Sequence, residues 1–191
     1  MRLFIALNLP KAEQDRIHRA TEPLRAMGLP VQWLDSKSYH LTLKFLGNVK
    51  SEQVAVVEKV LDRVAGETGA FPLTIEGFGA FPTIRRPQVL WVGIDPIPAL
   101  RCLKQDVEWG LANHGFKRET RAFHPHITLG RAGESEGAGA FRGLDDLSAE
   151  FMYQGKVPAN TVDLMRSQLS RHGPRYTLLR DSPLKTGSQR V

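Results

Sequence analysis

Two short stretches of alternating polar and apolar residues constrain the fold of this chain more than any other feature. Residues 40–43 read His-Leu-Thr-Leu, and residues 126–129 read His-Ile-Thr-Leu. Because neighbouring side chains of a β-strand point to opposite faces, each stretch predicts a strand with His and Thr on one face and two aliphatic residues on the other. Such a strand buries its apolar face against other elements, so the polar faces of both copies are free to line one shared space.

Strict alternation also assigns a face to the residues that follow the first copy. It puts Phe45 on the apolar face, and it puts Lys44 on the polar face beside His40 and Thr42. We therefore expect Phe45 in the core and Lys44 within reach of a ligand that the polar face holds.

The rest of the chain alternates between helical and strand patterns. Helices are expected at 11–27, 51–66, 97–114 and 144–151, and further strands at 3–8, 71–81, 88–94, 157–170 and 175–182. Ser51 is expected to be the N-cap of the second helix. The Gly- and Glu-rich residues 132–143 are expected to form a mobile loop, and residues 184–191 a frayed tail.

This order of elements predicts an α+β fold. We expect a single bilobal catalytic domain over residues 1–191, with two pseudo-repeats whose His-x-Thr strands lie at 40–46 and 126–131. Two antiparallel sheets would face a central cleft, and the helices would cover them on the outside.

Composition narrows the class of protein. A chain of 191 residues can bury a sizeable core, and a net charge of +6 favours a polyanionic partner. Its single cysteine, Cys102, cannot form an internal disulfide, which is typical of a reducing compartment. No apolar stretch approaches the roughly 18 to 20 residues of a membrane-spanning helix, and no signal-peptide pattern opens the chain. We therefore expect a soluble, cytoplasmic protein.

The paired His-x-Thr strands suggest chemistry at a phosphate. An imidazole has an unperturbed pKa of about 6.5, so one neutral ring can act as a general base while a second, protonated ring acts as a general acid. Threonine hydroxyls can donate hydrogen bonds to non-bridging oxygens whose charge rises in the transition state. Two imidazoles and two hydroxyls around one phosphorus atom would suit phosphoryl chemistry without a metal.

The doubled motif, together with RLFIALNLP at 2–10, GAFPTIRRPQVLWVGI at 79–94 and FHPHITLGR at 123–131, resembles the two-histidine phosphoesterase superfamily. The flanking phrases resemble its bacterial RNA 2′,3′-cyclic phosphodiesterase branch, also called 2′-5′ RNA ligases. The resemblance implies a bilobal fold with pseudo-two-fold symmetry. It also implies hydrolysis of a terminal 2′,3′-cyclic phosphate to a 2′-phosphate, with no metal or other cofactor, and weak 2′-5′ joining of RNA ends in the reverse sense.

The same resemblance implies roles for individual residues. His126 would be the base that activates water, and His40 the acid that protonates the departing 3′ oxygen. Thr42 and Thr128 would clamp the phosphate. Arg131 would approach the phosphate, although strict alternation aims it away from His126, so its role requires a bend after Gly130 or a reach from the end of the strand.

Three more residues are candidates at the substrate. Phe123 could stack a terminal base, and Lys44 could meet an RNA phosphate. His124 shares a side of the strand with His126, which would suit zinc or copper, but no carboxylate or cysteine partner recurs at a suitable spacing. We therefore expect no metal site, and the role of His124 stays open.

Two other functions remain compatible with the sequence. The chemistry could act on a cyclic phosphate of a small nucleotide or of ADP-ribose, or the chain could be a noncatalytic RNA-binding module. The partner expected first is an RNA end that bears a cyclic phosphate, and we expect a monomer that does not bind membranes. The sequence does not specify the RNA met in the cell, the base preference or the importance of ligation.

Overall fold

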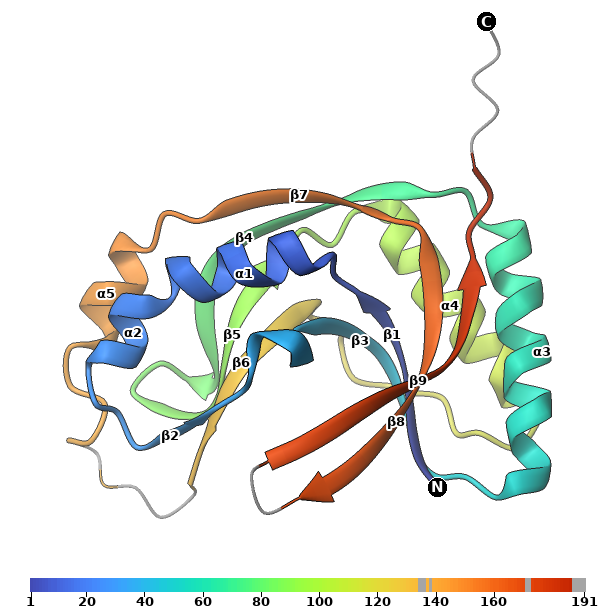
Figure 1. Cartoon of the computed structure of the whole chain (residues 1–191), viewed down its shortest axis with the longest axis horizontal. Helices are drawn as coiled ribbons and strands as arrows, with labels where there is room; N and C mark the ends of the chain where they lie inside the picture. The colour runs from blue at the N-terminus through green and yellow to red at the C-terminus, as the bar shows by residue number, and fades with distance from the viewer. Residues whose placement is uncertain (134–136, 138, 171–172, 187–191) are drawn as a thin grey trace, which may run out of the picture.

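The computed structural model describes the whole chain except residues 134–136, 138, 171–172 and 187–191 (Figure 1). Its strands are β1 (Arg2–Asn8), β2 (Val31–Trp33), β3 (His40–Asn48), β4 (Phe71–Thr83), β5 (Arg86–Ile94), β6 (His126–Ala132), β7 (Gln154–Ala159), β8 (Thr161–Ser170) and β9 (Gly173–Pro183). Its helices are α1 (Lys11–Ala20), α2 (Glu22–Ala26), α3 (Ser51–Glu67), α4 (Pro98–Ala112) and α5 (Leu144–Glu150), with a 3-10 turn η1 at Ser36–Ser38. The α+β class predicted from the sequence is confirmed.

The nine strands form one antiparallel sheet in the order β7-β4-β5-β6-β3-β1-β8-β9, and β2 pairs with β6. The two strands that carry the His-x-Thr motifs, β3 and β6, are therefore neighbours at its centre, with three strands of the path beyond each of them. They pair only at Leu41 and Ile127, because β2 occupies the same edge of β6 from Gly130 onward. The two expected sheets are thus joined into one through this single pair.

Four of the five helices cover the sheet in two groups, one at each end (Figure 1). At one end α3 and α4 lie side by side and bury Leu61, Val64, Leu103 and Val107 in a large core with β1 and β3. At the other end α2 and α5 lie close together, and a smaller core unites Leu24 of α2 with Leu144 of α5. The motif strands run between these two groups.

Some predicted elements differ from the structure. The helix expected at 11–27 is divided at Thr21, because Pro23 has no N–H to donate within a helix. The strand expected at 157–170 is interrupted at Asn160, where the chain passes from β7, which pairs with β4, to β8, which pairs with β1. The helix that begins at Ser51 has Lys50 as its N-cap, without a side-chain hydrogen bond, so the expected Ser51 cap is wrong.

Two regions expected to be loose contain ordered contacts. Leu184 is buried and Lys185 donates a backbone hydrogen bond to the Thr68 carbonyl at 2.8 Å, so the expected frayed tail is wrong at these two residues. Residues 187–191 lie outside the described residues. Within the expected mobile loop, Phe141 is buried in the smaller core, while 134–136 and 138 lie outside the described residues. Burial of the apolar side chains of Leu184 and Phe141 stabilises these segments. The sequence around both residues is polar, so it did not predict their burial.

Candidate active site

The single pair that joins β3 to β6 brings the two motifs together. Leu41 of one motif pairs with Ile127 of the other in antiparallel register, and both side chains are buried. The residues on either side of this pair point to the opposite face of the sheet, so the His and Thr of both motifs share that face. This face lines a cleft of about 1260 Å³ whose wall contains His40, Thr42, His126 and Thr128.

Both imidazoles are oriented by the backbone in the same way. The Nδ1 of His40 lies 2.7 Å from the Ser38 carbonyl, and the Nδ1 of His126 lies 2.6 Å from the His124 carbonyl, two residues upstream in each case. A carbonyl can only accept, so each Nδ1 carries a proton and donates it. The Nε2 of each ring is then the atom that can exchange a proton at the reaction centre. In His40 this Nε2 lies 3.1 Å from the hydroxyl of Thr42, which donates to the neutral ring.

A β-bulge follows each motif at the same position. The pairing of β3 with β1 skips Leu43, and the pairing of β6 with β5 skips Leu129, which is the equivalent residue of the second motif. Each bulge adds one residue and reverses the alternation after it. Burial is identical along the first six residues of both strands: partly exposed and buried residues alternate, two consecutive buried residues follow, and the sixth is exposed.

The bulges overturn two predictions made from alternation and resolve a third. Phe45 is exposed and lines the cleft instead of the core. Arg131, its counterpart in the second motif, also lines the cleft, and its charge acts on both His126 and Tyr176. The change of direction comes from the bulge at Leu129, one residue before the expected bend after Gly130, and it brings Arg131 to the face of His126. The two halves place an aromatic ring and a guanidinium at equivalent positions.

Lys44 is the second corrected prediction. Its side chain is only 4% exposed, and its ammonium forms an ion pair with Glu108 of α4 and donates to the Lys117 carbonyl at 2.7 Å. The bulge turns Lys44 away from His40, so its charge is used inside the protein and is not offered to a phosphate. The equivalent residue in β6 is Gly130, where an added Cβ would lie 2.5 Å from a methyl group of Val31.

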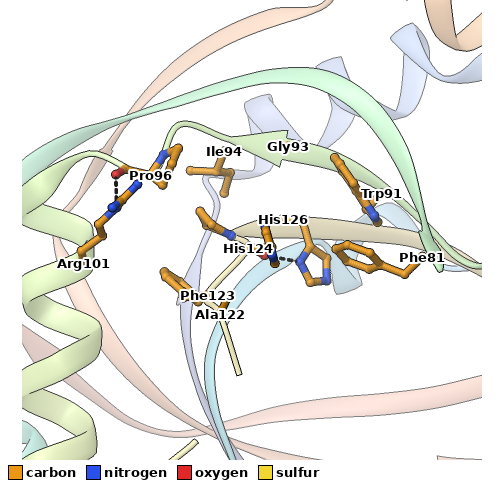
Figure 2. A pocket seen from close by; sticks show the side chains of 11 residues that line it. Phe81, Trp91, Gly93, Ile94, Pro96, Arg101, Ala122, Phe123, His124 and His126 are labelled. Carbon is orange, nitrogen blue, oxygen red and sulfur yellow. Dashed lines mark hydrogen bonds between the residues drawn. The ribbon is translucent and has the colours of Figure 1, made fainter. Parts of the chain in front are cut away.

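Aromatic rings flank both histidines. Phe4 and Tyr176 have ring centroids 4.9 Å and 5.1 Å from that of His40. The Phe81 ring lies edge-on to His126 with 5.0 Å between the centroids, and the Trp91 centroid lies 6.1 Å from that of His126. Figure 2 shows Phe81 and Trp91 beside His126. None of these four residues was predicted at the site. Trp91 pairs with Thr128 across β5 and β6, so pairing with a motif strand could have pointed to it. Tyr176 comes from β9, which does not pair with a motif strand, so no such signal exists for it.

A side pocket of about 620 Å³ opens beside His126 (Figure 2). Phe123 and His124 line both this pocket and the cleft. Phe123 is half-buried, and the Lys104 ammonium lies 5.8 Å from its ring centroid. His124 is exposed, and its backbone carbonyl orients His126, so the structure gives its main chain a positioning contact.

Burial favours the neutral form of both catalytic candidates. Burial is the largest effect on His40 and lowers its pKa to about 4. The hydrogen bond to the Ser38 carbonyl raises this pKa in part, and the charge of His126 lowers it further. Burial also lowers the pKa of His126, against the His124 carbonyl, and the charges of Arg131 and His124 add to this effect. At neutral pH both rings of the ligand-free protein are therefore uncharged.

The described wall of the cleft is strongly basic. It contains seven Lys and Arg residues, one of which is the buried Lys44, and two Glu residues, whereas the whole chain has a net charge of +6. Both glutamates are paired with cations: Glu108 with Lys44 and Lys104, and Glu119 with Arg121. Such a wall attracts an anionic ligand and raises its local concentration.

The acidic, histidine and cysteine side chains of the described residues are dispersed. In this part of the chain no three His, Cys, Asp or Glu side chains converge in a way that could hold a metal ion. Nor does any helix there have the length and apolar character needed to cross a bilayer.

Comparison with known proteins gives a consistent result. The sequence model of the 2′-5′ RNA ligase superfamily matches residues 13–172. A protein from Aeropyrum pernix named RNA 2′,3′-cyclic phosphodiesterase is 33% identical over 167 residues, which cover 86% of this chain and 92% of that protein. One with the same name from Methanothermobacter thermautotrophicus is 28% identical, with 93% and 95% covered.

Solved structures share the fold over nearly the whole chain. The crystal structure of LigT from E. coli in complex with 3′-AMP superposes with a TM-score of 0.71 at 28% identity, covering 97% of this chain and 98% of that chain. A protein from Thermus thermophilus superposes with a TM-score of 0.76 at 25% identity, covering 97% and 99%.

Proposed function

Because the chain belongs to the 2′-5′ RNA ligase superfamily, we propose that it is an RNA 2′,3′-cyclic phosphodiesterase that opens a terminal cyclic phosphate to a 2′-phosphate. The observation that carries this proposal is the matched pair of imidazoles at one cleft. Each has its Nδ1 proton donated to a backbone carbonyl, each has a threonine two residues later, and each is followed by the same bulge.

The reaction needs one proton to leave and another to arrive. The Nε2 of His126 takes a proton from a water molecule, whose oxygen attacks the phosphorus atom opposite the 3′ oxygen. The bond from phosphorus to the 3′ oxygen breaks, and the protonated Nε2 of His40 gives its proton to that oxygen. The product is a 2′-phosphate beside a free 3′-hydroxyl. The two histidines have then exchanged protonation states, which proton transfer with solvent restores.

Other groups stabilise the charge that develops on phosphorus. The hydroxyls of Thr42 and Thr128 donate to the non-bridging oxygens, and the Arg131 guanidinium lies on the same face to compensate their negative charge. The Thr42 hydroxyl, which contacts His40 in the free protein, can turn to the phosphate once Nε2 is protonated. A 5′-hydroxyl that replaces the water would form a 2′-5′ linkage by the same proton transfers.

An acid must carry a proton, but His40 is neutral in the free protein because its pKa is low. The charge of the substrate resolves this difficulty. A pKa of about 4 describes the empty cleft. A cyclic phosphate brings one negative charge between the two rings, and a nearby opposite charge favours protonated imidazole. Substrate binding and proton uptake by His40 are therefore coupled, so the acid acquires its proton when it has a phosphate to act on.

We also propose that the active unit is a monomeric bilobal domain in the cytoplasm. Both histidines and both threonines come from one chain, so the cleft needs no second copy to supply them. The free thiol of Cys102 is exposed, which suits a reducing compartment.

The proposed function is tested by a product-resolved assay. A short oligoribonucleotide with a 2′,3′-cyclic end is incubated with the protein, and 2′-phosphate is separated from 3′-phosphate. We expect 2′-phosphate alone, and we expect His40→Ala and His126→Ala each to lower the rate by about 100- to 10,000-fold while circular dichroism stays unchanged. Unchanged turnover in both variants would refute the assignment, and a noncatalytic RNA-binding module would release no product at all.

A further inference from the structure

An aromatic and basic patch lies at the mouth of the cleft, beyond the groups used in the proposed chemistry. It consists of Trp109 on α4 together with Lys117, Arg118 and Arg121 on the segment that follows this helix, and we call it the rim. Trp109 is 49% exposed, so about half of its large aromatic side chain is accessible to a ligand. Lys117, Arg118 and Arg121 all line the cleft, so the rim is continuous with it.

Trp109 and Arg118 form a stacked pair. The central carbon of the Arg118 guanidinium lies 3.6 Å from the centroid of the Trp109 ring. A cation–π contact at this distance holds the guanidinium over the ring, and its N–H groups can still donate hydrogen bonds. The pair therefore offers a planar surface and a cation together, on side chains that are exposed in the free protein.

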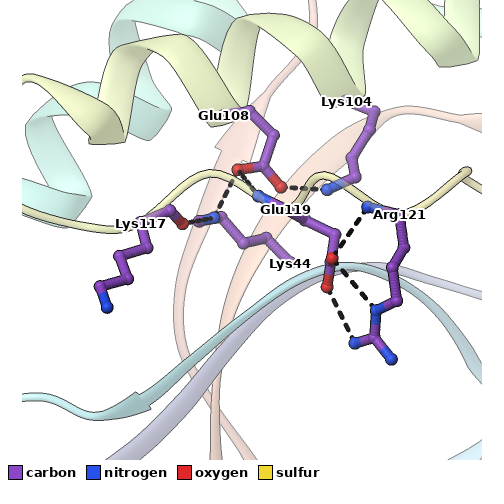
Figure 3. Close-up of polar contacts among 6 residues, drawn as sticks. All are labelled: Lys44, Lys104, Glu108, Lys117, Glu119 and Arg121. Carbon is purple, nitrogen blue, oxygen red and sulfur yellow. Dashed lines mark hydrogen bonds and ion pairs between the residues drawn. The ribbon is translucent and has the colours of Figure 1, made fainter.

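The segment that carries Lys117, Arg118 and Arg121 has no helix or strand of its own, but its backbone is held from beneath (Figure 3). Lys44 forms an ion pair with Glu108 and donates to the Lys117 carbonyl at 2.7 Å. The Glu119 N–H donates to the same Glu108 carboxylate at 3.2 Å. Figure 3 shows the Lys117 side chain directed away from this network, so its charge faces outward.

Two of the three cations on the rim have no acid partner among the described residues. Arg121 is neutralised by Glu119, whose carboxylate accepts from it at 3.0 and 3.2 Å. Neither Lys117 nor Arg118 has an acidic group within ion-pair distance in the part of the chain that the structure describes. An exposed aromatic ring beside uncompensated cations is the combination that binds single-stranded nucleic acid, where bases stack and phosphates meet the charges.

We propose that the rim binds the RNA strand on the 5′ side of the cyclic end, with a base against the Trp109–Arg118 pair and a phosphate at Lys117 and Arg118. This inference rests on the proposed function and specifies its substrate: an oligonucleotide end is preferred to a cyclic mononucleotide. A mononucleotide reaches the histidines and Arg131 but has no second base or phosphate to place on the rim.

The test compares 2′,3′-cyclic AMP with a short oligoribonucleotide that ends in the same cyclic adenosine. Losing one base stack should lower kcat/KM of Trp109→Ala about tenfold on the oligomer, and change it less than about twofold on 2′,3′-cyclic AMP. Trp109→Phe keeps a stacking ring and should recover most of the oligomer activity. Arg118→Ala should reduce the slope of log kcat/KM against log salt concentration by about 0.7 on the oligomer alone.

A matched control removes a cation elsewhere. Lys59 is exposed on α3 and does not line the cleft, so Lys59→Ala should have the wild-type kcat/KM on both substrates. Equal losses on both substrates in Trp109→Ala, or no loss on the oligomer, would overturn the role of the rim.

Binding of an oligomer that already ends in a 2′-phosphate is measured in parallel, because it requires no turnover. If the wild type opens neither cyclic substrate, the proposed function fails. Weaker oligomer binding by Trp109→Ala still supports the rim in that case, and unchanged binding refutes it.

Discussion

The burial of His40 has a measurable consequence for the pH dependence of catalysis. With a pKa of about 4, roughly one free molecule in a thousand carries a proton on this ring at pH 7, and each further pH unit reduces that fraction tenfold. The pKa of His126 lies below the usual imidazole value of about 6.5, so His126 adds little slope well above that pH. If His40 is the acid, kcat/KM should therefore fall about tenfold per pH unit between roughly pH 7.5 and 8.5.

The turnover number should behave differently. In the complex the negative charge of the phosphate raises the pKa of His40, so kcat should fall much less than kcat/KM over the same range. Initial rates are measured at substrate concentrations far below and far above KM, at constant ionic strength. His114→Ala, which removes an exposed histidine that does not line the cleft, serves as the control and should leave both profiles unchanged. A kcat/KM that stays flat or rises toward pH 8.5 would refute His40 as a buried acid protonated upon binding.

Three further outcomes are expected from the structure. Lys44→Met leaves Glu108, which is 7% exposed, with Lys104 as its one remaining side-chain partner among the described residues. This variant should lower the free energy of unfolding in urea by about 3 kcal/mol, and an unchanged midpoint would contradict the buried ion pair. Gly130→Ala places a methyl group 2.5 Å from Val31 and should cost about 1 to 3 kcal/mol, with lower kcat as β2 and the end of β6 move apart; unchanged thermal unfolding would show that β2 yields freely. Dialysis against EDTA should leave turnover unaltered, since in the proposed mechanism His40 and His126 perform both proton transfers, and a loss restored by a divalent cation would count against that mechanism.

The two His-x-Thr pairs at the cleft could be predicted from sequence because their signal is local and repeated. A period of two over four residues puts His and Thr on one face whatever the rest of the fold is, and the same four-residue pattern at two places implies a shared purpose. The strands at 3–8 and 88–94 and the helix at 51–66 were likewise predicted from periodicity, and β1, β5 and α3 occupy nearly these ranges.

The residues just past each motif could not be predicted in the same way. A bulge depends on how a strand pairs with its neighbour, and neither Leu43 nor Leu129 differs locally from a residue in regular alternation. The error at Phe45 and Lys44 follows directly from this, because both were placed by continuing the period. Tyr176 could not be predicted for another reason. It lies beside His40 because of the sheet order β3-β1-β8-β9, which arises from pairing between strands far apart in the sequence.

The division of labour between the two imidazoles is tested most directly by replacing the bridging 3′ oxygen of the cyclic phosphate with sulfur. A thiolate leaves without a proton from the enzyme, since a thiol has a pKa of about 8.5. His40→Ala should therefore lose about 100- to 10,000-fold on the oxygen substrate but hydrolyse the sulfur substrate at close to the wild-type rate, whereas His126→Ala should be slow on both. Rescue of His126→Ala by sulfur would exchange the two roles, and equal losses by both variants on both substrates would contradict acid and base catalysis by this pair.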